Sequence, residues 1–462
     1  MTDERDFDVT LLGATGFAGG LIADYLAANA PASTRLAIAG RSPAKLDEVR
    51  ARFGRDVEAV TVDVDKEAAV RPLAERTRVL ITTVGPYIRF GEPVVAACAA
   101  SGTDYLDLTG EPEFTDLMYL QHHERAVETG ARLVHSCGFD SMPHDLGAQF
   151  TVEQLAEGVP ITVRGYVRAR GTFSGGTAAS ALEIMGRYRQ GKAVHDVRAK
   201  VEPEPEGRRV RVATGRIGFD RDIGAWVVPM PSIDPLVVAE SARQLPRYGP
   251  DFTYSHYWAG NSPFAAVGVV AGAAALFGAA QLPSARRAIA RLRPSGSGPT
   301  PEQRERAWFK VCFIGEADGT RVLTEVAGGD PGYTETATMI SEAALCLAHD
   351  DLPVTAGQVT TASAMGAVLR ARLERAGITF TVAPCAQPSS CSSRCRIRSI
   401  LTDERFASAP FSSSRATRSA SASAAAPSSA AARRASTPSA TSFSASATRA
   451  STISSSGTTR TI

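Results

Sequence analysis

The sequence predicts an α/β protein: a doubly wound parallel sheet, an inserted α+β domain, and a disordered C-terminal tail. Short apolar runs alternate with helical patterns through the first 150 residues, as in a parallel sheet with helices on both faces. Beyond about residue 155 the strands show period two, and after residue 383 hydrophobic periodicity ends. We therefore expect divisions at 1–150, 151–350, 351–383 and 384–462.

Strands and helices take turns along the first division. The apolar runs that read as buried strands are 8–14, 35–41, 57–64, 78–87, 103–110 and 131–140. The segments with helical spacing are 20–30, 42–54, 67–76, 93–102, 118–130 and 141–150. Ser42 is the expected cap of the second helix, with Pro43 in its first turn.

The second division has a different pattern. Segments 161–171 and 209–219 alternate with arginines on one side, which favours a partly exposed antiparallel sheet. An apolar-faced helix is expected between them, over 175–191. This domain is also the candidate interface of a homodimer.

Residues 252–285 carry no formal charge when His256 is neutral, and 264–280 are almost entirely apolar. Two interpretations stay open. Residues 264–280 could form a helix that makes peripheral contact with a membrane, although it is short for a spanning helix. Alternatively, it is a buried helix or a wall of a substrate tunnel.

The last 79 residues differ from the rest of the chain. Ser, Ala and Arg supply 50 of them, which leaves little to form a core. The tail carries ten arginines and two acids, so residues 1–383 carry a net charge of −6. Its composition resembles a shifted reading of GC-rich coding DNA, a frameshift hypothesis that mass spectrometry of its peptides would test.

Charge and cysteine usage limit the partners and the compartment. Residues 1–383 contain no long basic run, so we expect no nucleic-acid partner. The seven cysteines form no CxxC pair, and the charged N-terminus runs directly into a strand. We therefore expect a cytoplasmic protein, with membrane association through 264–280 as the alternative.

A glycine turn follows the first strand. Gly13, Gly16 and Gly19 have the spacing G-x-x-G-x-x-G, and Thr15 and Phe17 lie between them. Glycine is needed where a backbone turns tightly and its N–H groups approach a pyrophosphate, at the positive end of a helix. Strand, turn and helix together predict a Rossmann-type site for a dinucleotide.

The end of the second strand indicates which dinucleotide. An acidic residue there would bind the ribose 2′-hydroxyl, but this chain has Arg41 and Ser42. Both side chains can hydrogen-bond a 2′-phosphate. The cofactor expected is therefore NADP(H).

Two further strand ends complete the expected cofactor site. Ligands of such sheets bind beyond the carboxyl ends of the strands. The residues expected there are Asp63 and Val64 near the adenine, and Thr83, Val84, Gly85 and Pro86 near the ribose and nicotinamide.

The chain resembles the saccharopine dehydrogenase-like oxidoreductases, and within them the branch of the trans-acting enoyl reductases of mycobacterial lipid synthesis. The resemblance covers about residues 6–383. It rests on the segments 13–19, 39–42, 83–111, 135–147, 175–182, 329–339 and 364–380. The segments TTASAMG and PSGSGP depart from the family pattern, and the tail has no place in it.

The resemblance implies an oxidoreductase with a Rossmann domain, an inserted substrate domain and a final segment that packs back on the first. The uncharged stretch suits a lipid-like substrate, so reduction of a polarised double bond is favoured. A saccharopine-type amino-acid dehydrogenase and a non-catalytic dinucleotide-binding scaffold remain alternatives.

Hydride transfer also needs a source of protons. Tyr87, just after Gly85 and Pro86, is a candidate donor, with a buried strand-end tyrosine as the alternative. Asp140, in the polar segment HSCGFDSMPHDLG, is the second candidate, although it and Asp145 could instead cap the following helix. The spacing of His135, Cys137 and their neighbours matches no zinc pattern, so no metal is expected. His122 and His123 are expected on a solvated helix face.

Overall fold

The computed structural model describes residues 5–171, 182–282, 284–285 and 298–383. The tail predicted for 384–462 lies outside the described residues, as do residues 175–181 of the helix predicted for 175–191. The described part of that segment, 182–191, is helical apart from a turn at residue 187.

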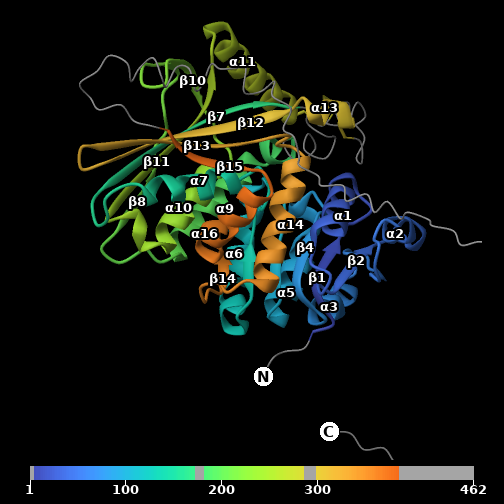
Figure 1. Cartoon of the computed structure of the whole chain (residues 1–462). Helices are drawn as coiled ribbons and strands as arrows, with labels where there is room; N and C mark the ends of the chain where they lie inside the picture. Colours follow the sequence, from blue (N-terminus) through green and yellow to red (C-terminus); the bar gives the residue numbers. More distant parts are fainter. Residues whose placement is uncertain (1–4, 172–181, 283, 286–297, 384–462) are drawn as a thin grey trace, which may run out of the picture. The chain divides into compact units, whose positions relative to one another are not determined.

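Seven parallel strands form one sheet, in the order β14-β6-β5-β4-β1-β2-β3 (Figure 1). The strands are β1 (Phe7–Leu12), β2 (Leu36–Gly40), β3 (Glu58–Thr61), β4 (Thr77–Thr82), β5 (Asp104–Leu106), β6 (Arg132–Val134) and β14 (Gly357–Val359). The first six are the strands that the sequence predicts, and their order is that of a doubly wound sheet. The predicted fold class is confirmed.

Helices cover both faces of this sheet. They are α1 (Phe17–Asn29), α2 (Pro43–Arg50), α3 (Glu67–Glu75), α4 (Tyr87–Phe90), α5 (Glu92–Ser101), α6 (Pro112–Thr129), α7 (Met142–Glu153) and α14 (Thr334–His349). Neighbouring residues of one strand enter different cores. Val79 and Ile81 of β4 pack in one hydrophobic cluster and Leu80 in the other, because successive strand side chains point to opposite faces.

The second sheet is mixed, with the order β15-β13-β12-β7-β11-β10-β9 and β8 paired to β11. Its strands are β7 (Ile161–Arg170), β8 (Arg209–Val212), β9 (Gly218–Asp220), β10 (Ala225–Pro229), β11 (Asp251–Gly260), β12 (Trp308–Ala317), β13 (Thr320–Gly328) and β15 (Thr379–Ala383). The antiparallel prediction for 161–171 and 209–219 holds for the pairing of β7 with β12 and of β9 with β10. It is wrong for β8, which runs parallel to β11, and β7 also runs parallel to β11 on its other side. Helical crossovers through α9 and α10 allow this arrangement.

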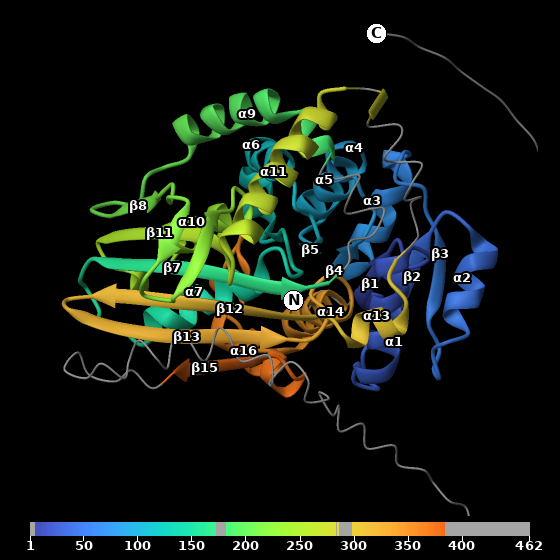
Figure 2. The same cartoon turned by 90° about the horizontal axis from the view of Figure 1, so that it is seen from above.

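The remaining helices are α9 (Tyr188–Val201), α10 (Asp234–Gln244), η1 (Pro246–Tyr248), α11 (Pro263–Ala280), α13 (Pro301–Glu305), α15 (Thr361–Ala364) and α16 (Gly366–Arg375). α7 packs against β7, β12 and β13 of the mixed sheet; Figure 1 shows it below that sheet, and in Figure 2 it lies beneath the same strands. Gly147 lets α7 approach the mixed sheet, since a Cβ there would lie 2.4 Å from the ring of Phe313.

The C-terminal part of the described chain contributes to both sheets. β14 pairs with β6, and β15 pairs with β13. α14 packs against α1 and β4. His123 of α6 accepts a hydrogen bond at 3.0 Å from the backbone N–H of Gln358 in β14, so it is half-buried rather than on a solvated face. The exact domain boundaries stay a prediction.

The uncharged stretch 252–285 is a strand followed by a helix. β11 is a central strand of the mixed sheet, and α11 takes up residues 263–280. Only 11% of α11 is buried. The alternative of a buried helix is therefore wrong.

Candidate functional site

The turn between β1 and α1 holds its shape through two of its three glycines. Gly13 has φ +90°, and a Cβ there would lie 2.5 Å from Oγ1 of Thr83. A Cβ on Gly19 would lie 2.1 Å from the carbonyl oxygen of Gly13. Both positions require glycine, the first for its backbone conformation and the second for close packing of helix on turn.

Gly16 differs, because it faces open space. It is exposed, and a Cβ there would meet only the carbonyl oxygen of Gly13, at 3.4 Å. Gly16 is also the N-cap residue of α1, with an extended backbone and no side-chain cap. The free N–H groups and positive end of α1 thus border a space that fits a pyrophosphate.

Thr15 and Phe17 lie on either side of Gly16. The Thr15 hydroxyl oxygen lies 3.7 Å from the position of a Cβ on Gly40, so it sits beside the end of β2. The Phe17 ring packs edge-on against Tyr333, with centroids 5.1 Å apart. Phe17 therefore connects the start of α1 to the segment before α14.

Arg41 and Ser42 follow β2 at the same edge. Arg41 is exposed, and no hydrogen bond or ion pair joins its side chain to the described part of the chain. Ser42 occupies the N-cap position of α2 as predicted, but its hydroxyl makes no capping bond. Both side chains therefore keep donors that a phosphate could use.

The other predicted cofactor residues are placed less uniformly. Asp63 and Val64 follow β3, which ends at Thr61. The Val64 side chain is buried in the core. Only Asp63 is half-buried at the edge of the sheet, where a cofactor could reach it. The Thr83 hydroxyl donates to the carbonyl oxygen of Gly13 at 3.2 Å, which ties the ends of β1 and β4 together.

Val84, Gly85 and Pro86 continue the edge after Thr83. Gly85 is exposed, and Val84 and Pro86 are half-buried. A methyl group of Val84 lies 3.0 Å from the position of a Cβ on Gly13. This loop therefore lies beside the glycine turn, as the sequence predicts.

Tyr87 is buried and its hydroxyl is fully bonded. The hydroxyl donates to the carbonyl oxygen of Thr82 at 3.2 Å and accepts from the N–H of Leu108 at 3.2 Å. Burial raises the pKa of Tyr87 well above its usual value, and the charge of Asp107 adds to this. These contacts match the alternative that the sequence left open, a buried tyrosine at the strand end.

The Glu111 carboxylate holds the start of α4. It accepts from the N–H groups of Tyr87 at 3.1 Å and Ile88 at 2.9 Å. The negative charge thus satisfies free N–H groups at a helix start. Glu111 therefore fixes the loop between β4 and α4.

Asp107, after β5, organises the neighbouring segment. Its carboxylate bonds to Nδ1 of His135 at 2.7 Å, the Tyr105 hydroxyl at 3.0 Å and the N–H of Ser136 at 2.8 Å. Cys137 is buried beside them, and burial raises the pKa of its thiol well above its usual value. This cluster is a structural support for the loop after β6.

Asp140 is the accessible acid of that loop. Its side chain is exposed, and its Oδ2 lies 3.7 Å from the position of a Cβ on Gly110, the glycine that follows β5. The surrounding protein nevertheless desolvates the carboxyl, and the charge of Asp234 opposes its ionisation. Together they raise the pKa of Asp140 to about 7.

Asp145 does not cap α7. It lies inside the helix, fully buried, and its carboxylate accepts from the Thr361 hydroxyl at 2.7 Å and the N–H of Ala362 at 2.8 Å. The prediction of a cap at Asp145 is wrong, because α7 begins at Met142 with Ser141 as its N-cap residue. Asp145 instead joins α7 to the start of α15.

His144, Asp234 and His256 form a buried group that the sequence analysis missed. Nδ1 of His144 lies 3.4 Å from Asp234, and Nε2 of His256 lies 3.5 Å from it. Burial lowers the pKa of both imidazoles, that of His256 to about 4, while the histidines keep the pKa of Asp234 below its usual range. Two neutral imidazoles and one carboxylate at these distances could hold a divalent metal ion.

No sequence motif contains these three residues together. His144 comes from α7, Asp234 from the start of α10 and His256 from β11. Only packing of α10 against α7 and β11 brings them together. His135 and Cys137, which the zinc-pattern comparison named, lie in the separate Asp107 cluster.

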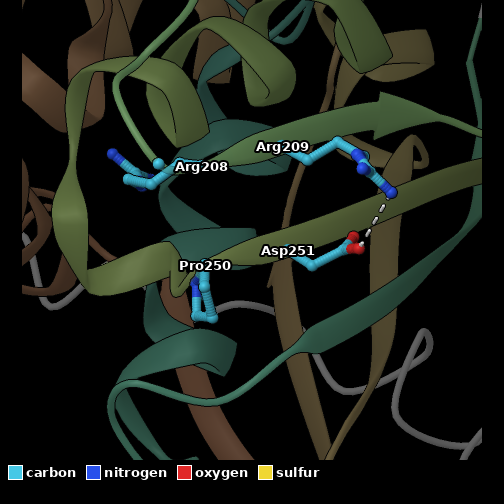
Figure 3. A pocket seen from close by; sticks show the side chains of 5 residues that line it. Arg208, Arg209, Pro250 and Asp251 are labelled. Atoms are coloured by element: carbon cyan, nitrogen blue, oxygen red, sulfur yellow. Dashed lines mark ion pairs between the residues drawn. The ribbon is translucent and has the colours of Figure 1, made fainter.

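A shallow cavity of about 320 Å³ lies elsewhere, between the starts of β8 and β11 (Figure 3). Arg209 pairs there with Asp251 at 4.0 Å. The Arg208 guanidinium donates to the carbonyl oxygens of Leu245 and Gly249, so it closes the end of α10. These contacts are structural and lie on the mixed sheet, away from the glycine turn.

Residues 9–134 match the family model described as the saccharopine dehydrogenase NADP binding domain. A putative trans-acting enoyl reductase of Mycobacterium tuberculosis is 36% identical, over 81% of this chain and 97% of that protein. Trans-acting enoyl reductases of Mycobacterium ulcerans and Mycobacterium leprae are 34% and 32% identical over the same shares. Among solved structures, apo saccharopine dehydrogenase (L-Glu forming) from Saccharomyces cerevisiae gives a TM-score of 0.46 at 14% identity, over 81% of this chain and 99% of that one.

Proposed function

This chain belongs to the saccharopine dehydrogenase-like oxidoreductases, in the branch of the trans-acting enoyl reductases, and we propose that it reduces an enoyl-type double bond in a lipid or polyketide-derived substrate with NADPH. Membership rests on relatives at 32–36% identity that align over 81% of the chain. The class of oxidoreductase follows from it. The double bond, the lipid and the preference for NADPH are the proposal.

One observation carries the proposal: an accessible carboxyl group with a pKa raised to about 7, on the loop after β6 of the parallel sheet that bears the glycine turn. Reduction of an enoyl group adds hydride to the β-carbon and a proton to the α-carbon. A group with a pKa near 7 is suited to give that proton. Asp140 is accessible, whereas the Tyr87 hydroxyl is buried and bonded on both sides.

The described residues fit the cofactor. Gly16 leaves space at the free N–H groups of α1, and Arg41 and Ser42 keep donors for a 2′-phosphate at the end of β2. When bound, NADPH would supply the hydride. Thr83 and Glu111 fix the two loops beside this space through hydrogen bonds to backbone groups.

Asp234 is a positioning residue in this mechanism. Burial disfavours the negative charge of Asp234, but His144 and His256 stabilise it, and this charge opposes ionisation of Asp140. Asp140 therefore keeps its proton at a pH where an ordinary carboxyl group has lost it. The proton that Asp140 gives to the substrate is replaced from solvent, to which the side chain is open.

The test is turnover of a long-chain trans-2-enoyl thioester with NADPH deuterated at C4. We expect deuterium at the β-carbon and a kcat that falls as the pH rises through about 7, since only protonated Asp140 donates. Asp140→Asn should lower kcat by about 10²–10⁴-fold, and Asp65→Asn, at an exposed acid, should leave it unchanged.

Asp234→Asn separates positioning from catalysis. Burial is the main cause of the raised pKa of Asp140, and the Asp234 charge adds to it. Removing that charge should therefore move the alkaline limb of the kcat profile to lower pH while Asp140 stays in place. An unmoved limb would exclude this role. Turnover of saccharopine without turnover of the enoyl thioester would favour the amino-acid dehydrogenase instead.

A further inference from the structure

The helix α11 has an unusual surface. It contains no charged residue, and of its 18 residues only Ala266 and Ala280 are buried. Phe264 is 85% exposed and Val267 is 67% exposed. A helix that is apolar all round is normally buried in a core or in a membrane, and the described chain does not bury α11.

The contacts of α11 leave most of it uncovered. A narrow stripe that includes Ala266 and Ala280 packs against β10 and β11. Near its end, Phe277 packs edge-on against Tyr188, with centroids 6.2 Å apart, and Gln281 donates to the carbonyl oxygen of Met185 at 2.9 Å. Figure 1 shows α11 on the side of the mixed sheet away from α7 and α16.

The charged residues that follow α11 in the sequence are all basic up to residue 301. Arg286, Arg287, Arg291 and Arg293 follow within 13 residues of Ala280, and no acidic residue occurs before Glu302. Arginines directly beside an apolar helix complement anionic lipid headgroups, to which each contributes about 1 kcal/mol near the surface.

The strand pairing determines how α11 could meet a bilayer. The chain leaves the mixed sheet at Gly260 and returns at Trp308, and β7 is the neighbour of both strands. Trp258 pairs with Val167, and Trp308 pairs with Arg170, so both ends of the excursion lie at the same end of β7. A spanning α11 would require the four arginines to return across the bilayer, which is costly.

We propose that α11 is a monotopic helix that docks the protein on an anionic lipid surface, with its exposed apolar side in the acyl boundary, and that the arginines that follow it in the sequence account for a preference for anionic headgroups. This interaction does not depend on the proposed reductase activity.

The segment that α11 contacts connects it to the edge of the parallel sheet where the expected cofactor site lies. The segment that α11 contacts, around Met185 and Tyr188, also pairs Glu183 with Arg89 of α4 at 2.8 Å and Arg187 with Glu113 of α6. α4 directly follows the loop Val84–Pro86 of the expected cofactor site.

The test is flotation of the full-length protein with vesicles of phosphatidylcholine alone or with phosphatidylglycerol. We expect binding that prefers the anionic vesicles and weakens with salt. The double variant Phe264→Ser with Val267→Ser should bind the vesicles more weakly. The loss of the phenylalanine alone should reduce partitioning onto the vesicles by about tenfold or more. Val354→Ser, at a fully exposed apolar residue outside α11, is the matched control and should change nothing.

The arginines give an independent arm. Arg286→Gln with Arg287→Gln should lower affinity for phosphatidylglycerol vesicles by about fivefold for each charge, with little change on neutral vesicles. The proposal is overturned if the wild-type protein floats with neither vesicle. It is also overturned if Phe264→Ser with Val267→Ser turns a dimer into a monomer by light scattering without changing flotation, since a second copy would then cover α11.

Discussion

The glycine turn at 13–19 and the loop at 135–141 both follow strands of the same parallel sheet, but they are built differently. The turn presents backbone to a ligand, and the residues that shape it lie within seven positions of one another, apart from Thr83. The loop presents one carboxyl group, Asp140, whose properties depend on Asp234, 94 positions further along the chain. The proposed phosphate site thus depends mainly on residues that are close in the sequence, whereas the properties of the proposed proton donor depend on a distant residue.

The largest expected effect is the loss of cofactor binding at the glycine turn while the fold stays intact. Gly16→Val should abolish NADPH binding, because its side chain would occupy the space beside the N–H groups of α1, while its backbone is already extended. Calorimetric titration with NADPH measures the binding, and the melting temperature should stay near that of the wild type.

Gly19→Ala is the contrasting control. Its Cβ would lie 2.1 Å from the carbonyl oxygen of Gly13, so it should cost about 1–3 kcal/mol of stability through overpacking. If the two variants lost stability equally, Gly16 would be a packing glycine and its cofactor role would be refuted.

Arg41→Ala should have an intermediate effect, restricted to one cofactor. Loss of a charged hydrogen bond to the 2′-phosphate costs about 1–3 kcal/mol, so NADPH should bind more weakly while NADH is unaffected. Titration with both cofactors measures the difference. An equal loss for both would show that Arg41 does not read the 2′-phosphate.

The smallest effect concerns Tyr87, which lies between the two regions. Tyr87→Phe removes the partner of the Leu108 N–H and of the Thr82 carbonyl, and unmade buried hydrogen bonds cost about 1–3 kcal/mol. We expect a melting temperature lower by a few degrees and a kcat that keeps its pH dependence. A kcat loss as large as that of Asp140→Asn would make Tyr87 the proton donor.

The parallel sheet was the most predictable part of the fold. Its strands are continuous apolar runs because both faces are covered, and the glycines mark where β1 turns into α1. The mixed sheet was less predictable. The alternation in 161–171 predicted strands correctly, but strand direction depends on connections through α9 and α10, which alternation does not encode.

The sequence by itself determined the dinucleotide turn, the absence of an acid after β2 and the apolar, arginine-flanked character of 264–293. Each of these follows from neighbouring residues acting on one backbone segment. Only the tertiary structure decided that α11 is exposed, that Tyr87 is fully bonded and that Asp234 lies between His144 and His256. Burial and electrostatic coupling depend on what packs in space, and distant residues become neighbours only when the sheets and helices assemble.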